Sequence, residues 1–114
     1  MWRTLPLLLL LAGCTAAGGV GPLGRCDAVL RVSNGADQAI EQLYVSPTGP
    51  GGWGQDRLAP NTLPPGGQFQ TPTGNEAQFV RVVFVDGSAI EMGGLEVCAT
   101  PMLRVGPRSL QPER

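Results

Sequence analysis

The hydrophobic pattern of the chain is strongest from Phe79 to Met92. Residues 79–85 are an almost unbroken run of β-branched and aromatic side chains that leads into Asp86-Gly87, a dipeptide suited to the positive φ angles of a tight hairpin turn. A second, shorter apolar run follows this turn. The pattern predicts a β-hairpin folded about Asp86-Gly87, with Val83 paired to Ile90.

The first strand of this hairpin carries apolar side chains at successive positions, and successive side chains point to opposite faces of a strand. We therefore expect protein to cover both faces and the strand to lie in the middle of a sheet. The two apolar sets are Val80, Val82 and Phe84 on one side, and Phe79, Val83 and Val85 on the other.

Shorter periodic segments flank the hairpin. Residues 28–34 alternate, with the even-numbered side chains inward, and end at the turn signal Asn34-Gly35. Residues 40–46 fit a strand if one residue bulges near Gln42, and a single helical turn is the alternative. Three further segments predict short strands: an edge strand at 68–71 that Pro72 ends, an alternating segment at 95–99 and an edge strand at 102–105.

Together these elements predict an all-β fold, a small antiparallel β-sandwich or flattened barrel of about six or seven strands. We expect this domain to span residues 26–105 and residues 106–114 to form a disordered tail. Residues 46–62 are rich in glycine and proline and form the longest irregular stretch. A loop of this length in a small domain is usually functional or held down by its own side chains, here Trp53 and Leu58.

The first 13 residues have the pattern of an export signal, because Arg3 precedes an apolar run that is too short to span a bilayer. The run ends in Leu11-Ala12-Gly13-Cys14, which resembles the lipobox of bacterial lipoproteins. The resemblance implies cleavage before Cys14 and a lipid on its sulfur that anchors the chain to the membrane. Cleavage after Ala17 is the alternative, and it leaves a soluble periplasmic or secreted protein.

Residues 14–25 then read as the lipidated cysteine followed by a flexible, glycine-rich tether. In lipoproteins the residue after the cysteine influences sorting, and Thr15 is not the aspartate that usually retains them in the inner membrane. The resemblance therefore favours the outer membrane, with the domain facing the periplasm.

The chain has three cysteines, and two remain if Cys14 carries lipid. Cys26 and Cys98 precede the first strand and follow the last strong one, and an even count in an oxidising compartment predicts a disulfide between them. That bond closes a loop of about 72 residues and stabilises the fold by about 4 kcal/mol in the chain-entropy model. A reactive thiol at Cys98 is the weaker alternative, since the chain has no histidine to act as its base.

Composition argues against catalysis. The chain has no histidine, the commonest general base and zinc ligand, and its nine carboxylates are dispersed. We expect a protein that is not an enzyme and holds no cofactor or metal. A calcium site at Asp56 and Asn61, or a copper site at Met92 and Met102, is less expected than solvated carboxylates and core methionines.

The charge distribution and the glycine-rich stretch argue against binding of nucleic acid and of a phosphate group. The eight basic residues, all arginine, are scattered, and the formal net charge is −1, so we expect no nucleic-acid binding. The glycine-rich stretch Gly49 to Gly54 lacks the lysine and the strand-to-helix context of a phosphate-binding loop.

Short blocks of the sequence resemble a family of small exported proteins found mostly in proteobacteria, for which no biochemical activity is established. The most specific blocks are Tyr44-Val45-Ser46-Pro47 and Trp53-Gly54-Gln55-Asp56, and the resemblance covers about residues 26–100. Members commonly have a cysteine and a tyrosine-aspartate pair before the arginine-valine strand, where this chain has Glu76, Gln78 and Phe79. The departure implies that Cys98 has a different partner, Cys26.

Aromatic residues are only 5% of the chain, so their positions are informative. Exposed tryptophan and tyrosine anchor many interfaces, and we expect Tyr44, Trp53 and Asp56 to form a contact patch. The alternative is that Trp53 packs back over the sandwich edge as a local core.

The sequence thus predicts a non-enzymatic cell-envelope lipoprotein, an interaction or accessory module that presents loop 46–62 to an envelope protein. A periplasmic carrier of a small ligand or a metal is the alternative function.

Overall fold

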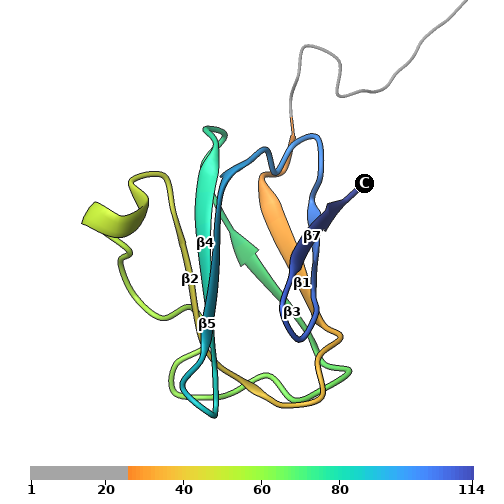
Figure 1. Ribbon diagram of the computed structural model, residues 1–114. Helices are drawn as coiled ribbons and strands as arrows, with labels where there is room; N and C mark the ends of the chain where they lie inside the picture. Colours follow the sequence, from red (N-terminus) through yellow and green to blue (C-terminus); the bar gives the residue numbers. More distant parts are fainter. Residues whose placement is uncertain (1–25) are drawn as a thin grey trace, which may run out of the picture.

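The computed structural model describes residues 26–114, and the export signal, Cys14 and the tether lie outside this range. The described chain is an all-β sandwich of two facing sheets, as predicted (Figure 1). Seven strands and one short 3-10 turn follow in the order β1 (Val29–Asn34), β2 (Ile40–Ser46), η2 (Gly49–Gly51), β3 (Gln68–Pro72), β4 (Gln78–Phe84), β5 (Ala89–Leu95), β6 (Met102–Val105) and β7 (Leu110–Glu113).

The four-stranded sheet has the order β3-β1-β6-β7, and the three-stranded sheet has the order β2-β4-β5. Neighbouring strands are antiparallel except for β1 and β6, which run parallel with Arg31 opposite Met102. The sandwich is therefore antiparallel, as predicted, apart from this one parallel pair. Parallel strands need a long crossover, and residues 35–101 provide it by building most of the rest of the domain.

The core lies between the two sheets and is formed by inward side chains of all seven strands and of the loops between them. Alternation along β1 and β4 is as predicted, because every second residue of each strand is buried. The largest fully buried apolar side chains are Phe84, Leu30, Ile40, Leu43, Leu95 and Leu103.

The opposite face of β4 is not fully covered, which corrects the prediction. β4 is central in its sheet, but Val83 is only half-buried and Val85 is 51% exposed. The reason is that no third layer lies on this face. Near the start of β4 the η2 turn covers Phe79, whose ring lies against Gly49.

The hairpin of β4 and β5 forms, but its register differs by one residue from the prediction. Val82, not Val83, pairs with Ile90. The Gly87 amide donates to the Phe84 carbonyl at 2.8 Å, and the Phe84 amide donates to the Ser88 carbonyl at 2.8 Å. Within this turn only Gly87 has a positive φ, of 91°. These bonds define a three-residue loop with a glycine bulge in place of a two-residue turn.

The observed register is the one that serves the core. A shift of one residue reverses the face of every side chain on a strand. In the predicted register Glu91 faces inward with Val82, whereas in the structure Ile90 and Met92 pack against the core and Glu91 pairs with Arg81 on the outer face.

Two irregularities shape the three-stranded sheet, a register shift between Ile40 and Gln42 and another between Gln78 and Val80. The bulge predicted near Gln42 is confirmed by a register shift between Ile40 and Gln42, and no helical turn replaces the strand there. β5 continues through Gly93 and Gly94 to Leu95, so a separate strand at 95–99 does not exist. Residues 96–100 instead turn, with the amides of Ala99 and Thr100 donating to the Glu96 carbonyl.

The C-terminal segment is ordered, contrary to the predicted tail after residue 105. Residues 110–113 form β7, which pairs with β6 so that β6 becomes an interior strand of its sheet instead of an edge. Leu110 pairs with Val105 and packs against the core. One apolar residue in a four-residue strand is too weak a pattern to predict, and Pro112 is tolerated because β7 is an edge strand.

Asn34 joins the end of β1 to two turns. Its side chain is buried and fully used: the amide donates to the carbonyls of Gln38 (3.0 Å) and Leu63 (2.9 Å), and the oxygen accepts from the Ala36 amide (2.9 Å). The chain does turn after Asn34, as predicted, and the hydrogen bonds of the buried Asn34 side chain hold the turn. Each of these three bonds avoids the free-energy cost of an unpaired buried polar group.

The disulfide between Cys26 and Cys98 is present, with the two Cα atoms 5.7 Å apart. It lies just before the starts of β1 and β6, the parallel pair, and the Arg31 amide donates to the Pro101 carbonyl at 2.8 Å beside it. The bond therefore links two strands that no short turn can connect.

Replacing both cysteines, Cys26→Ser with Cys98→Ser, is expected to lower the free energy of unfolding by about 4 kcal/mol, because the bridge restricts the unfolded chain. Urea denaturation followed by circular dichroism measures the change. The wild-type chain under a strong reductant serves as control and is expected to match the double variant. Equal stability of the oxidised wild type and the double variant contradicts the prediction.

Candidate functional site

Loop 46–62 begins with a tightly hydrogen-bonded turn. The Ser46 hydroxyl donates to the Gly52 carbonyl at 2.6 Å, the Thr48 hydroxyl donates to the same oxygen at 2.8 Å, and the Thr48 amide donates back to Ser46 Oγ at 3.1 Å. These bonds close the chain around η2. The glycine-rich stretch is therefore a fixed turn in which each hydroxyl has a partner.

Asp56 fixes the middle of the loop to β2. One carboxylate oxygen, Oδ1, accepts hydrogen bonds from the backbone amides of Leu43 and Leu58, each at 2.9 Å. Hydrogen bonds of this kind, to a charged acceptor, are about twice as strong as neutral ones. Asp56, which the sequence assigns to the contact patch with Tyr44 and Trp53, thus uses Oδ1 to hold the loop on β2.

Arg57 connects the two sheets, a role that the sequence analysis missed. Its guanidinium donates to the Val45 carbonyl of β2 (2.9 Å) and, on β3, to the Pro72 carbonyl (2.7 Å) and the Thr71 hydroxyl (2.5 Å). The planar guanidinium has enough donors to reach both strands at once. A lone arginine next to a loop aspartate was the available signal.

The same loop and the residue that follows it, Leu63, close the outer edge of β2. Ile40 and Leu63 exchange two backbone hydrogen bonds of 2.9 Å, and the Arg57 amide donates to the Leu43 carbonyl at 2.7 Å. Together with Asp56 and the Arg57 side chain, these contacts pair the polar groups of an edge strand that a foreign strand could otherwise bind.

Tyr44 and Trp53 do come together. Their ring centroids are 6.3 Å apart with the planes tilted by 52°, a geometry within the favourable range for aromatic pairs. Both side chains are half-buried, so Trp53 is neither a core residue nor a freely exposed one. The Tyr44 hydroxyl donates to Gln42 Oε1 at 3.0 Å, which orients its ring.

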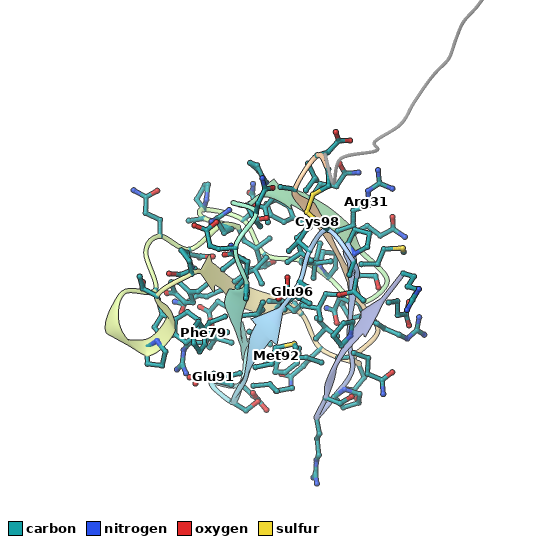
Figure 2. All side chains as sticks on the ribbon, turned by 90° about the horizontal axis from the view of Figure 1, so that it is seen from above. Arg31, Phe79, Glu91, Met92, Glu96 and Cys98 are labelled. Carbon is teal, nitrogen blue, oxygen red and sulfur yellow. A yellow bond between two sulfur atoms is a disulfide. The ribbon has the colours of Figure 1, made fainter. Side chains whose placement is uncertain are left out.

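A shallow hollow of about 270 Å³ lies beside this pair, and Trp53, Pro50, Phe79, Glu91, Met92 and Gly93 line it. Figure 2 shows Phe79, Glu91 and Met92 on the side of the molecule next to the η2 turn, away from Arg31 and Cys98. A Cβ atom at Gly93 would lie 2.9 Å from the Phe79 ring, so glycine is needed for the ring to rest there. We call Tyr44, Pro50, Trp53 and Phe79 the aromatic surface.

The polar rim of the aromatic surface is the ion pair between Arg81 and Glu91. Their side chains are 34% and 44% exposed. An ion pair this exposed contributes about 1 kcal/mol or less to stability. The pair also places one positive and one negative charge next to the hollow.

The structure also shows the surroundings of the cysteine and the methionines considered as reactive or metal-binding residues. Cys98 is bonded to Cys26, so the reactive-thiol alternative is wrong. Met92 packs against the core as predicted, but Met102 is 39% exposed on the other sheet, so it is not a core residue. Within residues 26–114, no three acidic or cysteine side chains come together as metal ligands, and no helix is long and apolar enough to span a membrane.

The hairpin turn contains a carboxylate with an unusual pKa. The pKa of Asp86 lies below its ordinary value of 3.8, chiefly because the Ser88 hydroxyl (2.7 Å) and the Ser88 amide (2.9 Å) donate to its charged form. The Gln38 side-chain amide donates to the other carboxylate oxygen at 3.2 Å.

Comparison of the chain with known protein families, with curated proteins and with solved structures found no match. The fold and the site by themselves define the protein as an all-β sandwich with an aromatic surface on a fixed loop. The family resemblance and the lipobox stay predictions from the sequence.

Asp56→Ala is expected to destabilise the protein by about 1 to 3 kcal/mol, because two backbone amides lose their acceptor. Chemical denaturation measures the change. Asp37→Ala is the matched control, since Asp37 is an exposed carboxylate in another loop, and it is expected to change stability little. Equal effects of the two substitutions contradict a supporting role for Asp56.

Asp86 makes stability depend on pH. Because its pKa is lower in the folded state than the unfolded value of 3.8, its stabilising effect is present above that value and is lost as pH falls through the folded pKa. We expect the Tm advantage of the wild type over Asp86→Asn to stay constant from about pH 7 to pH 5 and to shrink below about pH 4. A scanning calorimetry series measures it, with Asp37→Asn as control, and an advantage that grows on acidification contradicts the assignment.

Proposed function

We propose that this protein is an exported, lipid-anchored interaction module of the cell envelope that binds an envelope protein through its aromatic surface. The observation that carries the proposal is the pairing of half-buried Tyr44 and Trp53 beside a hollow lined by Phe79 and Pro50. Partly exposed aromatic rings in a shallow concavity are typical of the anchor points of protein interfaces.

Rigidity supports the proposal. Binding is weakened by the entropy lost when flexible side chains and loops become ordered. Here the loop that carries Trp53 is already fixed by Ser46, Asp56 and Arg57, and the Phe79 ring is confined between Gly49 and Gly93. A partner therefore meets a surface that needs little further ordering.

The position of the aromatic surface also supports the proposal. It lies on the outer face of the three-stranded sheet, whereas the described chain begins at Cys26, just before β1 of the four-stranded sheet (Figure 1). A lipid on Cys14 and the predicted tether of residues 15–25 attach at that beginning. The anchor and the aromatic surface then belong to separate parts of the domain, and both can be engaged at once.

Trp53→Ala is expected to abolish partner binding while leaving the fold intact, because Trp53 is half-buried on a loop that other residues hold. A photo-crosslinking amino acid at exposed Pro50, introduced in intact cells, measures binding as a covalent adduct. We expect a discrete adduct that disappears in the Trp53→Ala background and persists with Gln55→Ala, an exposed neighbour in the same loop.

The same crosslinker at Gln68, on the opposite sheet, is the positional control. Identical adducts from both positions, or an adduct that survives Trp53→Ala, contradict the proposal. Circular dichroism of the purified variants shows whether a loss of adduct has a structural cause.

Cys14→Ser is expected to release the protein from the membrane, since it removes the acceptor of the predicted lipid. Fractionation of cells into membrane and soluble parts measures the change, with Cys26→Ser plus Cys98→Ser as the control that spares Cys14. Unchanged membrane association of Cys14→Ser contradicts lipid anchoring and leaves the binding proposal to be tested by itself.

A further inference from the structure

A larger cavity, of about 510 Å³, lies between the two sheets on their open side. Its volume is in the ordinary range of small-ligand sites, about 300 to 1,000 Å³. The β4–β5 turn and β5 form one wall and the turn between β6 and β7 forms the other, and Gln38, Asp86, Ser88, Ala89, Ile90, Pro107 and Arg108 line it. No strand pairing closes this side, because β5 and β7 are the last strands of their sheets.

The cavity has one charge of each sign, and the two do not touch. Asp86 lies in the turn between β4 and β5, and Arg108 lies in the turn between β6 and β7. Among residues 26–114 the one ion pair is Arg81 with Glu91, so Arg108 faces the same space as Asp86 without forming a salt bridge to it. The space between them can receive a ligand that satisfies both charges.

The negative wall is fixed in place. Ser88 donates two hydrogen bonds to Asp86 Oδ1, and Gln38 donates to Oδ2 while its own Oε1 accepts from the Asp86 amide at 3.3 Å. Residues of two separate segments, the β4–β5 turn and the loop between β1 and β2, thus orient the carboxylate before any ligand arrives. Oδ1 already accepts two hydrogen bonds, but Oδ2 accepts only the one from Gln38, so Oδ2 has a second acceptor position for a ligand cation.

The rest of the lining is largely apolar. Ala89 and Ile90 belong to β5, Pro107 belongs to the opposite turn, and Ile90 also packs against the core. An apolar lining with a few placed polar groups is the usual composition of a small-molecule site.

From this arrangement we propose that the cavity binds a small zwitterion, an amino acid with an apolar side chain. Its ammonium group pairs with Asp86, its carboxylate accepts hydrogen bonds from the Arg108 guanidinium, and its side chain lies on Ile90 and Pro107. A guanidinium fits a carboxylate with two parallel hydrogen bonds, which gives the ligand a defined orientation. A simple anion or cation satisfies one wall and leaves the other charge without a partner.

The test is a titration of the purified chain with L-leucine, followed by the backbone amide signals of Ser88, Ile90 and Arg108 in nuclear magnetic resonance spectra. We expect saturable shifts with a Kd of about 1 mM or below. N-acetyl-leucine, which lacks the ammonium, and leucinamide, which lacks the carboxylate, are each expected to bind at least about tenfold more weakly.

Arg108→Gln is expected to weaken leucine binding about tenfold, equivalent to the loss of about 1.4 kcal/mol. Arg114→Gln is the matched control, because it removes the same charge from the C-terminal residue, which does not line the cavity. The absence of saturable shifts, or equal binding of leucine and both singly charged analogues, overturns the proposal.

The site is independent of the aromatic surface, so Trp53→Ala is expected to leave the leucine titration unchanged. Failure of either proposal is thus distinguishable from failure of the other.

Discussion

The parallel pairing of β1 with β6 is the constraint on which the rest of the structure depends. It aligns Arg31 with Met102, so the chain between them must cross to the three-stranded sheet and back twice before β6 runs in the same direction as β1. On the way it adds β2, then β3 beside β1, then β4 and β5. Such distant pairing is entropically costly to form. The Cys26–Cys98 bond lies where the two strands begin and reduces that cost, which explains how a domain with so small a core can hold a long crossover.

Local patterns in the sequence were sufficient to predict the strands in which apolar and polar side chains alternate. The β4–β5 hairpin, the alternation of β1 and the bulge in β2 follow from residues close together in the chain. The register of the hairpin did not follow, because it depends on how many residues the turn takes up. β7 was missed for a different reason: its pairing depends on the free edge of β6, and its own sequence has only Leu110 as a signal.

The candidate site was predictable in part. Residue type alone singled out Tyr44 and Trp53, and the structure places their rings together. Phe79 and Gly93 could not be assigned to the same surface, because they meet only in a register that the sequence did not specify. The roles of Asp56 and Arg57 were hidden too, since their partners are backbone groups of β2 and β3, which have no signature in the sequence. Loop 46–62 consequently does two things: it seals the edge of β2 and holds Trp53 in place.

The position of the disulfide has a mechanical consequence. A force applied through the residues before Cys26 enters the domain at a covalent junction, and β1 and β6 share it from their first residues onward. Both strands are then loaded along their length, so that their hydrogen bonds must yield together instead of opening one by one. A pull on the N-terminal end therefore cannot peel β1 from the sheet without loading β6 as well.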